Sequence, residues 1–462
     1  MPQVRNRHGL QFTAAGDVAS AAFDGAVMNY LSFSKDTGAS LKALLAADPD
    51  MPMAQCLRGY FFMLMGVGAL VGKARQDAQR LLAIEAQLNP RERLHARALD
   101  AWTNHSLGRA TALWQQIATL HPRDVLAIKM AHFGHFYVGD SRNVRDGVAA
   151  VLDFWSPEDD AYSYLQSMYA FGLEECGNPW QAEAVGREAL ARQPSDPWGI
   201  HAVAHALEAT GRTAEGVAWI DTMAGQWHGI NNFRYHVAWH KALFRFESGD
   251  YTNALLDYDQ IVYSDGATEY LDACNDASML LRLELAGTDV GDRWRAVAAK
   301  VASRTEERVL AFADLHFVLA LTSSPEPEHR ELAQRMVGLM EAYAQSEAAD
   351  AGLYRLAAVP AAKGLVAFRQ GRHADAVQGL AEAAPHLYRV GGSHAQRDLF
   401  AGVRAEAAFR ADRGAPDTLA LLAARTRSHP HNRRGWTLYL DALEQCGDAS
   451  AIAAARRRMT QT

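Results

Sequence analysis

The distribution of hydrophobic and polar positions predicts a chain made of paired helices. Large apolar residues recur three and four positions apart in segments such as WQAEAVGREAL (180–190) and YTNALLDYDQI (251–261), and this spacing places them on one face of an α-helix. A glycine followed by a polar residue separates such segments, because a helix commonly ends on a left-handed residue, where glycine has no Cβ to clash. The first five of these turns are spaced by 34 to 38 residues, and the full set is Gly139-Asp140, Gly177-Asn178, Gly211-Arg212, Gly249-Asp250, Gly287-Thr288, Gly371-Arg372 and Gly447-Asp448.

This period is typical of the tetratricopeptide unit, a pair of helices about 34 residues long. Small Ala and Gly residues early in each second helix favour close helix approach, and Pro follows some of these helices, as in HPRD (121–124) and QPSD (193–196). We therefore expect an all-α, tetratricopeptide-like helical-hairpin solenoid, wound as a right-handed superhelix. The alternative is an irregular helical bundle.

Three regions are expected along this solenoid. Residues 1–90 are helical by composition but lack the repeat, so they are predicted to form an atypical helical cap, as the ends of solenoids require. Residues 91–325 are predicted to hold the central repeats with a His-rich concave face, and residues 326–462 the C-terminal repeats and cap. The loop-like TSSPEP (322–327) marks the boundary between them.

Composition excludes several other classes of protein. The 462 residues are 49% hydrophobic and 21% charged with a net charge of −7, so no nucleic-acid partner is expected. The four cysteines lie far apart, which argues against a disulfide scaffold and a cysteine zinc site. The first residues lack a signal-peptide core, and the longest apolar stretch, GYFFMLMGVGALV (59–71), is too short to span a bilayer. We expect a cytoplasmic protein without a membrane partner.

Histidines form the most informative constellation. His201 and His205 are four residues apart, as are His236 and His240, so each pair lies on one face of its helix. The pairs are 35 residues apart, one repeat, and equivalent positions of adjacent repeats stack side by side. The four imidazoles are therefore predicted to converge.

Other polar residues recur on the first helices of the repeats, which line the concave surface of a tetratricopeptide superhelix. They predict a ligand-binding hollow and are His132, His135, Gln166, Tyr169, Asn275, Asp276, Asp314 and His316. The pair Glu174-Glu175 stands near a helix end and is expected to be solvated.

Convergent neutral imidazoles suit a divalent transition metal such as zinc or iron, so the predicted metal ligands are His201, His205, His236 and His240. An alternative is acid–base catalysis, since histidine titrates near neutrality. The candidate catalytic residues are His205, His240, Glu208 and Asp314.

A further string, VGGSHAQRDLF (390–400), predicts a helix start with Ser393 as its N-cap. Arg397 is a candidate donor to a carboxylate or phosphate, and the helix N-terminus favours an anion. His394, Gln396 and Asp398 complete this predicted anion site; the alternative is a capping box with a surface ion pair.

Several of these strings together resemble the tetratricopeptide repeat protein 38 family: HAVAHALEATGR, YHVAWHKALFRFESGDYTNALLDYDQIV, the Asp314–His316 pair and GGSHAQRDLF. The resemblance covers nearly the whole chain, with looser matches over the first ninety and last fifty residues. It implies a helical repeat fold and a cytosolic protein, and it implies no particular reaction.

Three functions remain open. The first is binding of a small polar or anionic molecule, or a peptide, in a His-rich concave pocket. The second is an enzyme, a metal-dependent or acid–base hydrolase or lyase with the histidine cluster as its active site. The third is a protein–protein scaffold, and a homo-oligomer is compatible with each.

Overall fold

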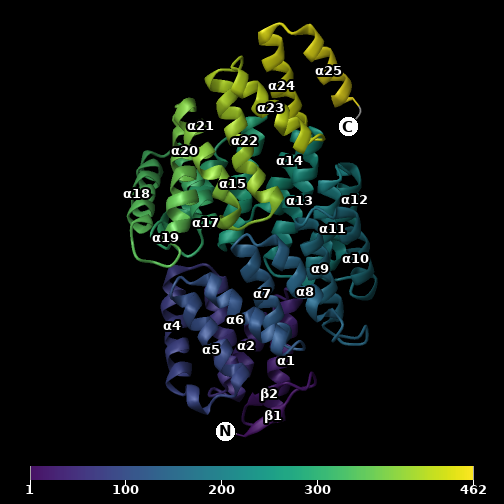
Figure 1. Cartoon of the computed structure of the whole chain (residues 1–462), viewed down its shortest axis with the longest axis vertical. Helices are drawn as coiled ribbons and strands as arrows, with labels where there is room; N and C mark the ends of the chain where they lie inside the picture. Colours follow the sequence, from purple (N-terminus) through teal and green to yellow (C-terminus); the bar gives the residue numbers. More distant parts are fainter. Residues whose placement is uncertain (1, 461–462) are drawn as a thin grey trace. The chain divides into compact units, whose positions relative to one another are not determined.

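The computed structural model describes residues 2–460, which divide into two compact units. The described part of the first unit comprises residues 2–209, 220–237 and 347–350, and that of the second comprises residues 210–219, 238–346 and 351–460. Almost all of the regular structure is helical (Figure 1). Among the described residues, no helix combines the length and the apolar character needed to cross a membrane.

The first unit begins with a short β-hairpin. Strands β1 (Gln3–Arg5) and β2 (Gln11–Thr13) pair antiparallel, with Val4 opposite Phe12. Phe12 is fully buried, and the Arg91 guanidinium lies 4.4 Å from the centre of its ring. The hairpin is too short for its alternation to stand out in the sequence, and it precedes the helices of the region expected to form a helical cap.

Helices make up the rest of the first unit. They are α1 (Asp17–Leu31), α2 (Thr37–Ala47), α3 (Pro52–Leu64), α4 (Gly68–Ala83), α5 (Pro90–Thr103), α6 (Leu107–Leu120), α7 (Val125–Tyr137), α8 (Ser141–Leu152), α9 (Tyr162–Glu175), α10 (Pro179–Arg192) and α11 (Pro197–Ala209), with short 3₁₀ segments at Glu85–Gln87 and Ala224–Gly229. Two helices, α12 (Thr213–Met223) and α13 (Phe233–Ser248), each run from one unit into the other.

The second unit continues with helices to the end of the described chain. They are α14 (Tyr251–Asp257), α15 (Tyr270–Leu285), α16 (Arg293–Val301), α17 (Ala311–Ser323), α18 (Pro327–Ala344), α19 (Ala351–Leu353), α20 (Val359–Arg369), α21 (His373–Ala383), α22 (His394–Ala411), α23 (Pro416–Ser428), α24 (Arg433–Cys446) and α25 (Ala449–Met459). A 3₁₀ turn at Ala302–Arg304, π segments at Tyr258–Val262 and Tyr354–Ala358, and a 3₁₀ segment at Ala384–Val390 interrupt them.

The glycine turns act as the sequence predicts. All seven glycines have a positive φ, between 69° and 89°, where a side chain would be strained. After three of them the following residue, Asp140, Asp250 or Asp448, caps the next helix by accepting its backbone N–H. One short polar turn therefore ends one helix and starts the next.

Packing of alternate helices defines the repeat. Within the first unit α9 packs against α8, α10 and α11, and within the second unit α15 packs against α16 and α17. First helices of successive hairpins thus contact one another as well as their own partners, as in a solenoid. The predicted all-α, tetratricopeptide-like architecture is confirmed. The predicted region boundaries at residues 90 and 325 stay predictions.

First helices are the most deeply buried elements. In α17 every residue from Ala311 to Ser323 is buried, and in α7 every residue from Val125 to His135 is buried. Close contact requires small residues, and a Cβ on Gly172 of α9 would lie 2.5 Å from the Cα of Arg145 in α8. The polar residues on these helices therefore sit in packed surroundings, where each must find a partner.

Candidate functional site

The histidine cluster is built on α11 in the first unit. Asp196 starts this helix by accepting the N–H of Trp198 on its Oδ1 atom at 3.0 Å, and Pro197 suits the first turn. His201 and His205 follow on one helix face, and His236 comes from the first turn of α13. Their exposed fractions are only 1–3%.

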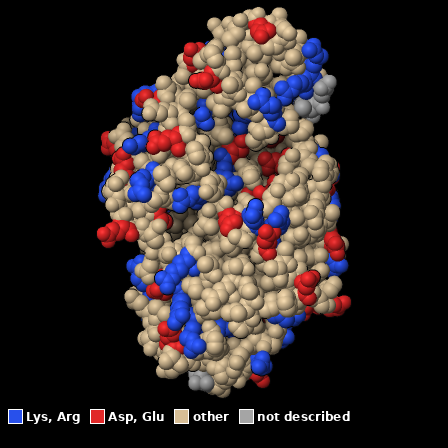
Figure 2. Space-filling view, in the orientation of Figure 1, with Lys and Arg blue, Asp and Glu red and all other residues tan. Residues whose placement is uncertain are grey.

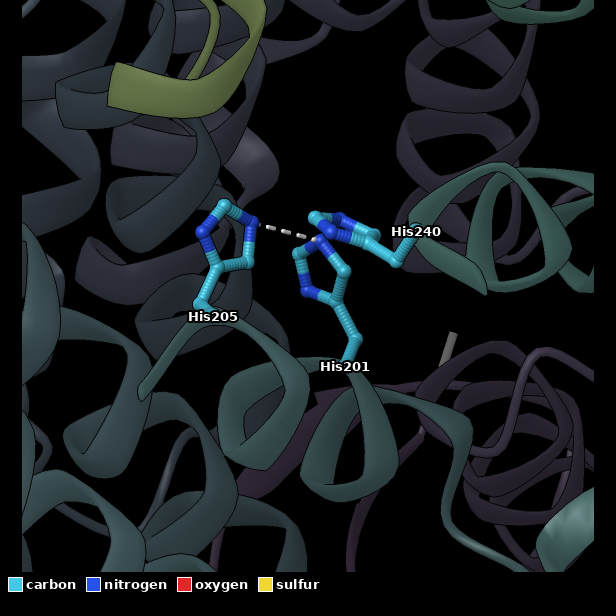
Figure 3. A group of neighbouring side chains, drawn as sticks. All are labelled: His201, His205 and His240. Carbon is cyan, nitrogen blue, oxygen red and sulfur yellow. Dashed lines mark hydrogen bonds between the residues drawn. The ribbon is translucent and has the colours of Figure 1, made fainter. Parts of the chain in front are cut away.

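His201 is the centre of the cluster. Its Nε2 atom lies 3.1 Å from Nε2 of His205 and 3.1 Å from Nε2 of His236. Figure 3 shows the His201 and His205 rings and the contact between them. The rings of His201 and His205 are nearly perpendicular, at 86°, with their centres 4.5 Å apart.

Each of these nitrogen pairs has room for one proton. If both nitrogens carried hydrogen, two N–H groups would face each other in a buried place. When its Nε2 is deprotonated, His201 has one lone pair there and accepts from one neighbour at a time, or a metal ion can take the proton's place. The arrangement therefore favours neutral imidazoles, the form that binds metals.

Two carboxylates complete the polar cluster. Glu174 and Glu175 end α9, and one oxygen of each lies, with a nitrogen of His205, inside a group whose members are all within 4.8 Å. Oε2 of Glu174 is 3.5 Å from Nδ1 of His205. Glu174 is 6% and Glu175 5% exposed, so the expectation that they are solvated is wrong. The helix end that carries them is covered, because α9 lies between α8, α10 and α11.

Aromatic rings enclose the cluster. Phe171 stacks on His201 at 5.4 Å and meets His205 edge-on at 5.3 Å between ring centres. Trp198 lies 5.0 Å from His201, and Phe233 lies 5.5 Å from His236. Such a wall lowers the local dielectric, so charges and metal–ligand bonds inside it are screened less than in water.

Lys129 is a polar residue that the sequence reasoning missed. It lies on α7, is 1% exposed and has its ammonium 4.6 Å from the centre of the Trp198 ring. The sequence feature that could have indicated its burial is that Lys129 is the one lysine inside the largely apolar segment VLAIKMAHF (125–133). Burial lowers the pKa of the Lys129 ammonium from its usual value, while the Asp196 carboxylate opposes the change.

His132 and His135 of α7 do not join the histidine cluster through any contact seen here. Nδ1 of His132 lies 3.2 Å from the Val144 carbonyl oxygen, and its ring meets Trp198 edge-on at 5.7 Å. Burial lowers the pKa of His132 to about 3. His135 pairs with Asp140 at 3.4 Å, and burial lowers its pKa as well.

The other predicted residues of the first unit have packing roles. Gln166 is buried and accepts from Arg192 at 3.4 Å. Tyr169 packs against the apolar cluster around Leu173. Glu208 lies one turn beyond His205 on α11 and is partly exposed.

In the second unit, His240 lies one turn after His236 on α13, is 1% exposed and contacts the Trp239 ring at 5.0 Å. Asp314 accepts from the Tyr354 hydroxyl at 2.7 Å and pairs with Arg308 at 3.4 Å. Burial raises the pKa of Asp314 to about 6. This carboxylate thus has a local hydrogen-bonding role.

Three further predicted residues of that unit are also buried. Asp276 pairs with Lys300 at 2.9 Å, and burial raises the pKa of Asp276 to about 7. Asn275 precedes it on α15 and is 2% exposed. His316 places Nδ1 2.8 Å from the Phe312 carbonyl oxygen, and burial lowers the pKa of His316 to about 4.

The predicted helix start at residue 393 is confirmed. Ser393 caps α22 by accepting the Gln396 N–H, and the Gln396 side chain accepts the Ser393 N–H at 2.8 Å, which forms a capping box. Arg397 donates to the Gly392 carbonyl, and Asp398 accepts two bonds of 2.8 Å from Arg425.

His394 is exposed at the first position of this helix. The capping box and the ion pair therefore account for the polar contacts that were attributed to an anion site. Binding of an anion there stays a prediction.

Fold and cluster together define a class: an all-α, tetratricopeptide-like helical-repeat protein with a buried histidine–carboxylate cluster. No protein-family model matches the chain. Among solved structures, the human IFIT1 dimer with m7Gppp-AAAA is similar over 94% of this chain and 92% of that chain, with a TM-score of 0.36 and 10% sequence identity. A likeness this loose carries no argument about function.

Basic and acidic side chains are intermixed over the face shown in Figure 2.

Proposed function

We propose that this helical-repeat protein holds a divalent transition-metal ion, zinc or iron, at Nε2 of His201 and Nε2 of His205, and binds a small polar or anionic ligand there. The 3.1 Å between these nitrogens carries the proposal. Two imidazoles on one tetrahedral zinc ion, with bonds of about 2.0–2.1 Å, have their nitrogens roughly 3.3 Å apart. The observed separation is close to that value.

Glu174 supports the same assignment. A metal-bound imidazole commonly donates its other ring N–H to a carboxylate, which fixes the tautomer and strengthens the ligand. Oε2 of Glu174, 3.5 Å from Nδ1 of His205, is suited to that role. The carboxylate would leave Nε2 of His205 as the metal-binding atom.

Helix α13 is the proposed source of the remaining ligands. Nε2 of His236 lies 3.1 Å from Nε2 of His201, and His240 shares the same helix face one turn later. We propose that His236 and His240 are the third and fourth ligands of the metal. In the alternative, only one of them binds the metal, and the fourth coordination position is open to a bound molecule.

An open position would make a metal-dependent hydrolase or lyase, because a metal-bound water loses a proton near neutrality. A site with four protein ligands would instead be structural or ligand-binding. The proposal therefore extends to an enzyme only if a ligand position is free for exchange.

Metal content tests the proposal. The full chain, purified without an affinity tag, should carry a single zinc or iron ion by elemental analysis. His201→Ala and His205→Ala should lose it, whereas His132→Leu, a buried histidine of the same unit outside the cluster, should keep it. If the chain is folded by circular dichroism but binds no metal after incubation with zinc and with ferrous iron, the proposed metal site is wrong.

A second candidate is acid–base or ligand-binding chemistry without metal. The contacts of His201 with two other imidazoles favour it, because a chain of imidazoles can pass a proton. Metal-free protein that binds a small anion, and loses binding in His205→Gln, would select this version. If the chain binds neither a metal nor a small anion, the remaining hypothesis is a protein–protein scaffold.

We further propose that the chain belongs to the tetratricopeptide repeat protein 38 family and works in the cytoplasm, alone or as a homo-oligomer. The strings that contain His201, His205, His236 and His240 support membership. Expressing the chain with a fluorescent tag in its own cell type would test the location, and a secreted or membrane-bound product would contradict it.

A further inference from the structure

Lys129 lies in an aromatic cage. Its ammonium nitrogen is 4.3 Å from the centre of the Phe133 ring and 4.6 Å from the centres of the Phe33 and Trp198 rings. The residue is 1% exposed. Aromatic faces attract a cation, yet they replace hydration less fully than a carboxylate would.

The acidic group that interacts with Lys129 electrostatically is Asp196. Burial lowers the pKa of Lys129 and raises that of Asp196. Both effects favour the neutral amine with the neutral acid. His132, one turn along α7, is also held neutral at physiological pH, because burial lowers its pKa to about 3.

Phe33 covers the amine from a strained turn. Its φ of 52° is in the left-handed region, which a phenylalanine rarely occupies. Two backbone bonds hold the turn, from Lys35 N–H to the Gly229 carbonyl at 2.9 Å and from Asn231 N–H to the Phe33 carbonyl at 2.8 Å. Strain of this kind persists where the surroundings enforce it, and it concentrates at functional sites.

The Phe33 ring stacks on Trp198 and on Phe233. The three rings form one cluster: the Phe33 centre lies 4.4 Å from that of Phe233 and 5.7 Å from that of Trp198, and the Phe233 and Trp198 centres are 5.5 Å apart. All residues of the cage belong to the first unit. Phe133 and Trp198 lie on α7 and α11, whereas Phe33 lies in the turn after α1, so it is the cage residue outside these two helices.

We propose that Lys129 is a nucleophilic amine that forms an imine with a small aldehyde or ketone, and that the Phe33 turn is its cover. The Nζ lone pair attacks the carbonyl carbon, and a proton moves from nitrogen to oxygen to give a carbinolamine. Loss of water then forms the C=N bond. Asp196 can supply the proton to the departing hydroxyl and take the proton that leaves the nitrogen, so the acid is regenerated. Addition of water reverses the step without an oxidant or reductant.

The inference goes beyond the proposed metal site and does not depend on it. Trp198 is the shared wall, 5.0 Å from the His201 ring and 4.6 Å from the Lys129 ammonium. A carbonyl compound held by Lys129 would therefore lie beside the histidine cluster. Because imine formation needs no metal, the test is run with a chelator present.

Reductive trapping tests the proposal. The full chain is incubated at pH 7 with acetaldehyde, and separately with glyoxylate, in the presence of cyanoborohydride and a chelator, and modified peptides are followed by mass spectrometry. At this pH only about four in ten thousand molecules of an amine with the usual lysine pKa are neutral. Lys129 should be alkylated at least about tenfold faster than the exposed Lys42 and Lys73, with a rate that levels off at a lower pH than theirs.

Variants separate reactivity from access. Phe33→Ala removes the cover and should increase the trapping rate at Lys129 further, while Lys129→Arg should lose the selective adduct and keep the fold. If Lys129 reacts no faster than Lys42 both in the natural chain and in folded Phe33→Ala, Lys129 is a packing residue and the proposal is overturned. That result would not affect the proposed metal site at His201 and His205.

Discussion

Nε2 of His201 and Nε2 of His205 lie 3.1 Å apart in a place that is almost completely buried. Two charged imidazolium rings could not occupy these positions, because each would direct an N–H at the other. The pair therefore requires that a proton be shared between the nitrogens or that a metal ion bind both. Chemistry at this site depends on which of these is present, and the predictions below begin there.

Replacing the carboxylate that lies next to Nδ1 of His205 should lower the affinity for the metal without removing any of its ligands. In Glu174→Gln the side-chain size is kept, but the partner of Nδ1 of His205 loses its charge. Loss of such a partner typically reduces metal affinity about 10–100-fold. Competition with a chromophoric chelator measures the change. Glu188→Gln, at an exposed pair with Arg192, should leave affinity unchanged, and equal affinity in both variants would contradict the role of Glu174.

Acid stability should depend on His132. Burial lowers the pKa of His132 to about 3 in the folded chain, whereas an unperturbed histidine has a pKa of about 6.5. The unfolded chain therefore binds an extra proton between these values, and the free energy of unfolding should fall as pH drops from about 6.5 toward 3. His132→Leu removes this contribution. Urea unfolding at pH 7.5 and pH 5 should give a smaller pH-dependent loss for His132→Leu than for the natural chain, and an unchanged loss would contradict the assignment.

The sequence revealed the repeat and the histidine pairs because both follow from spacing. A turn at Gly139-Asp140 requires only a left-handed residue and a cap, and each is a property of one residue type. His201 and His205 share a face because they are four apart. Their contact with His236 then follows from one repeat stacking on the next.

Burial of charged groups could not be predicted in the same way. Glu174 and Glu175 look solvated in sequence because they end a helix, yet neighbouring helices cover that end. The cage of Lys129 depends on Phe33, which is far away in sequence and held by a strained turn. Such contacts depend on tertiary packing, which a period of 34 to 38 residues does not specify.

Close helix packing gives a sharp stability prediction. Gly172→Ala would place a Cβ 2.5 Å from the Cα of Arg145, whose backbone cannot easily move. Overpacking of this kind destabilises by about 1–3 kcal/mol. Gly25→Ala is the matched control, because Gly25 also lies inside a helix but has nothing within 4 Å. That variant should be neutral or stabilised by up to about 1 kcal/mol. Chemical denaturation of both measures the difference, and equal effects would contradict the close approach of α8 and α9.

The ion pair between Asp398 and Arg425 should stabilise the second unit. Arg425 donates two bonds of 2.8 Å to this carboxylate, and both side chains are largely buried, at 13% and 11% exposed. Asp398→Asn leaves the buried guanidinium without its counter-charge, which typically destabilises by about 3–5 kcal/mol. The guanidinium also holds the pKa of Asp398 below its usual range. The pair's contribution should therefore be complete above about pH 4 and be lost as pH falls through the lowered pKa.

Thermal unfolding at pH 7 checks the size of this effect, and the difference between Asp398→Asn and the natural chain should shrink on acidification. Glu444→Gln, at an exposed pair with Arg456, provides the control and should change stability by at most about 1 kcal/mol. An Asp398→Asn chain that is as stable as the natural one would contradict the structural role of the pair.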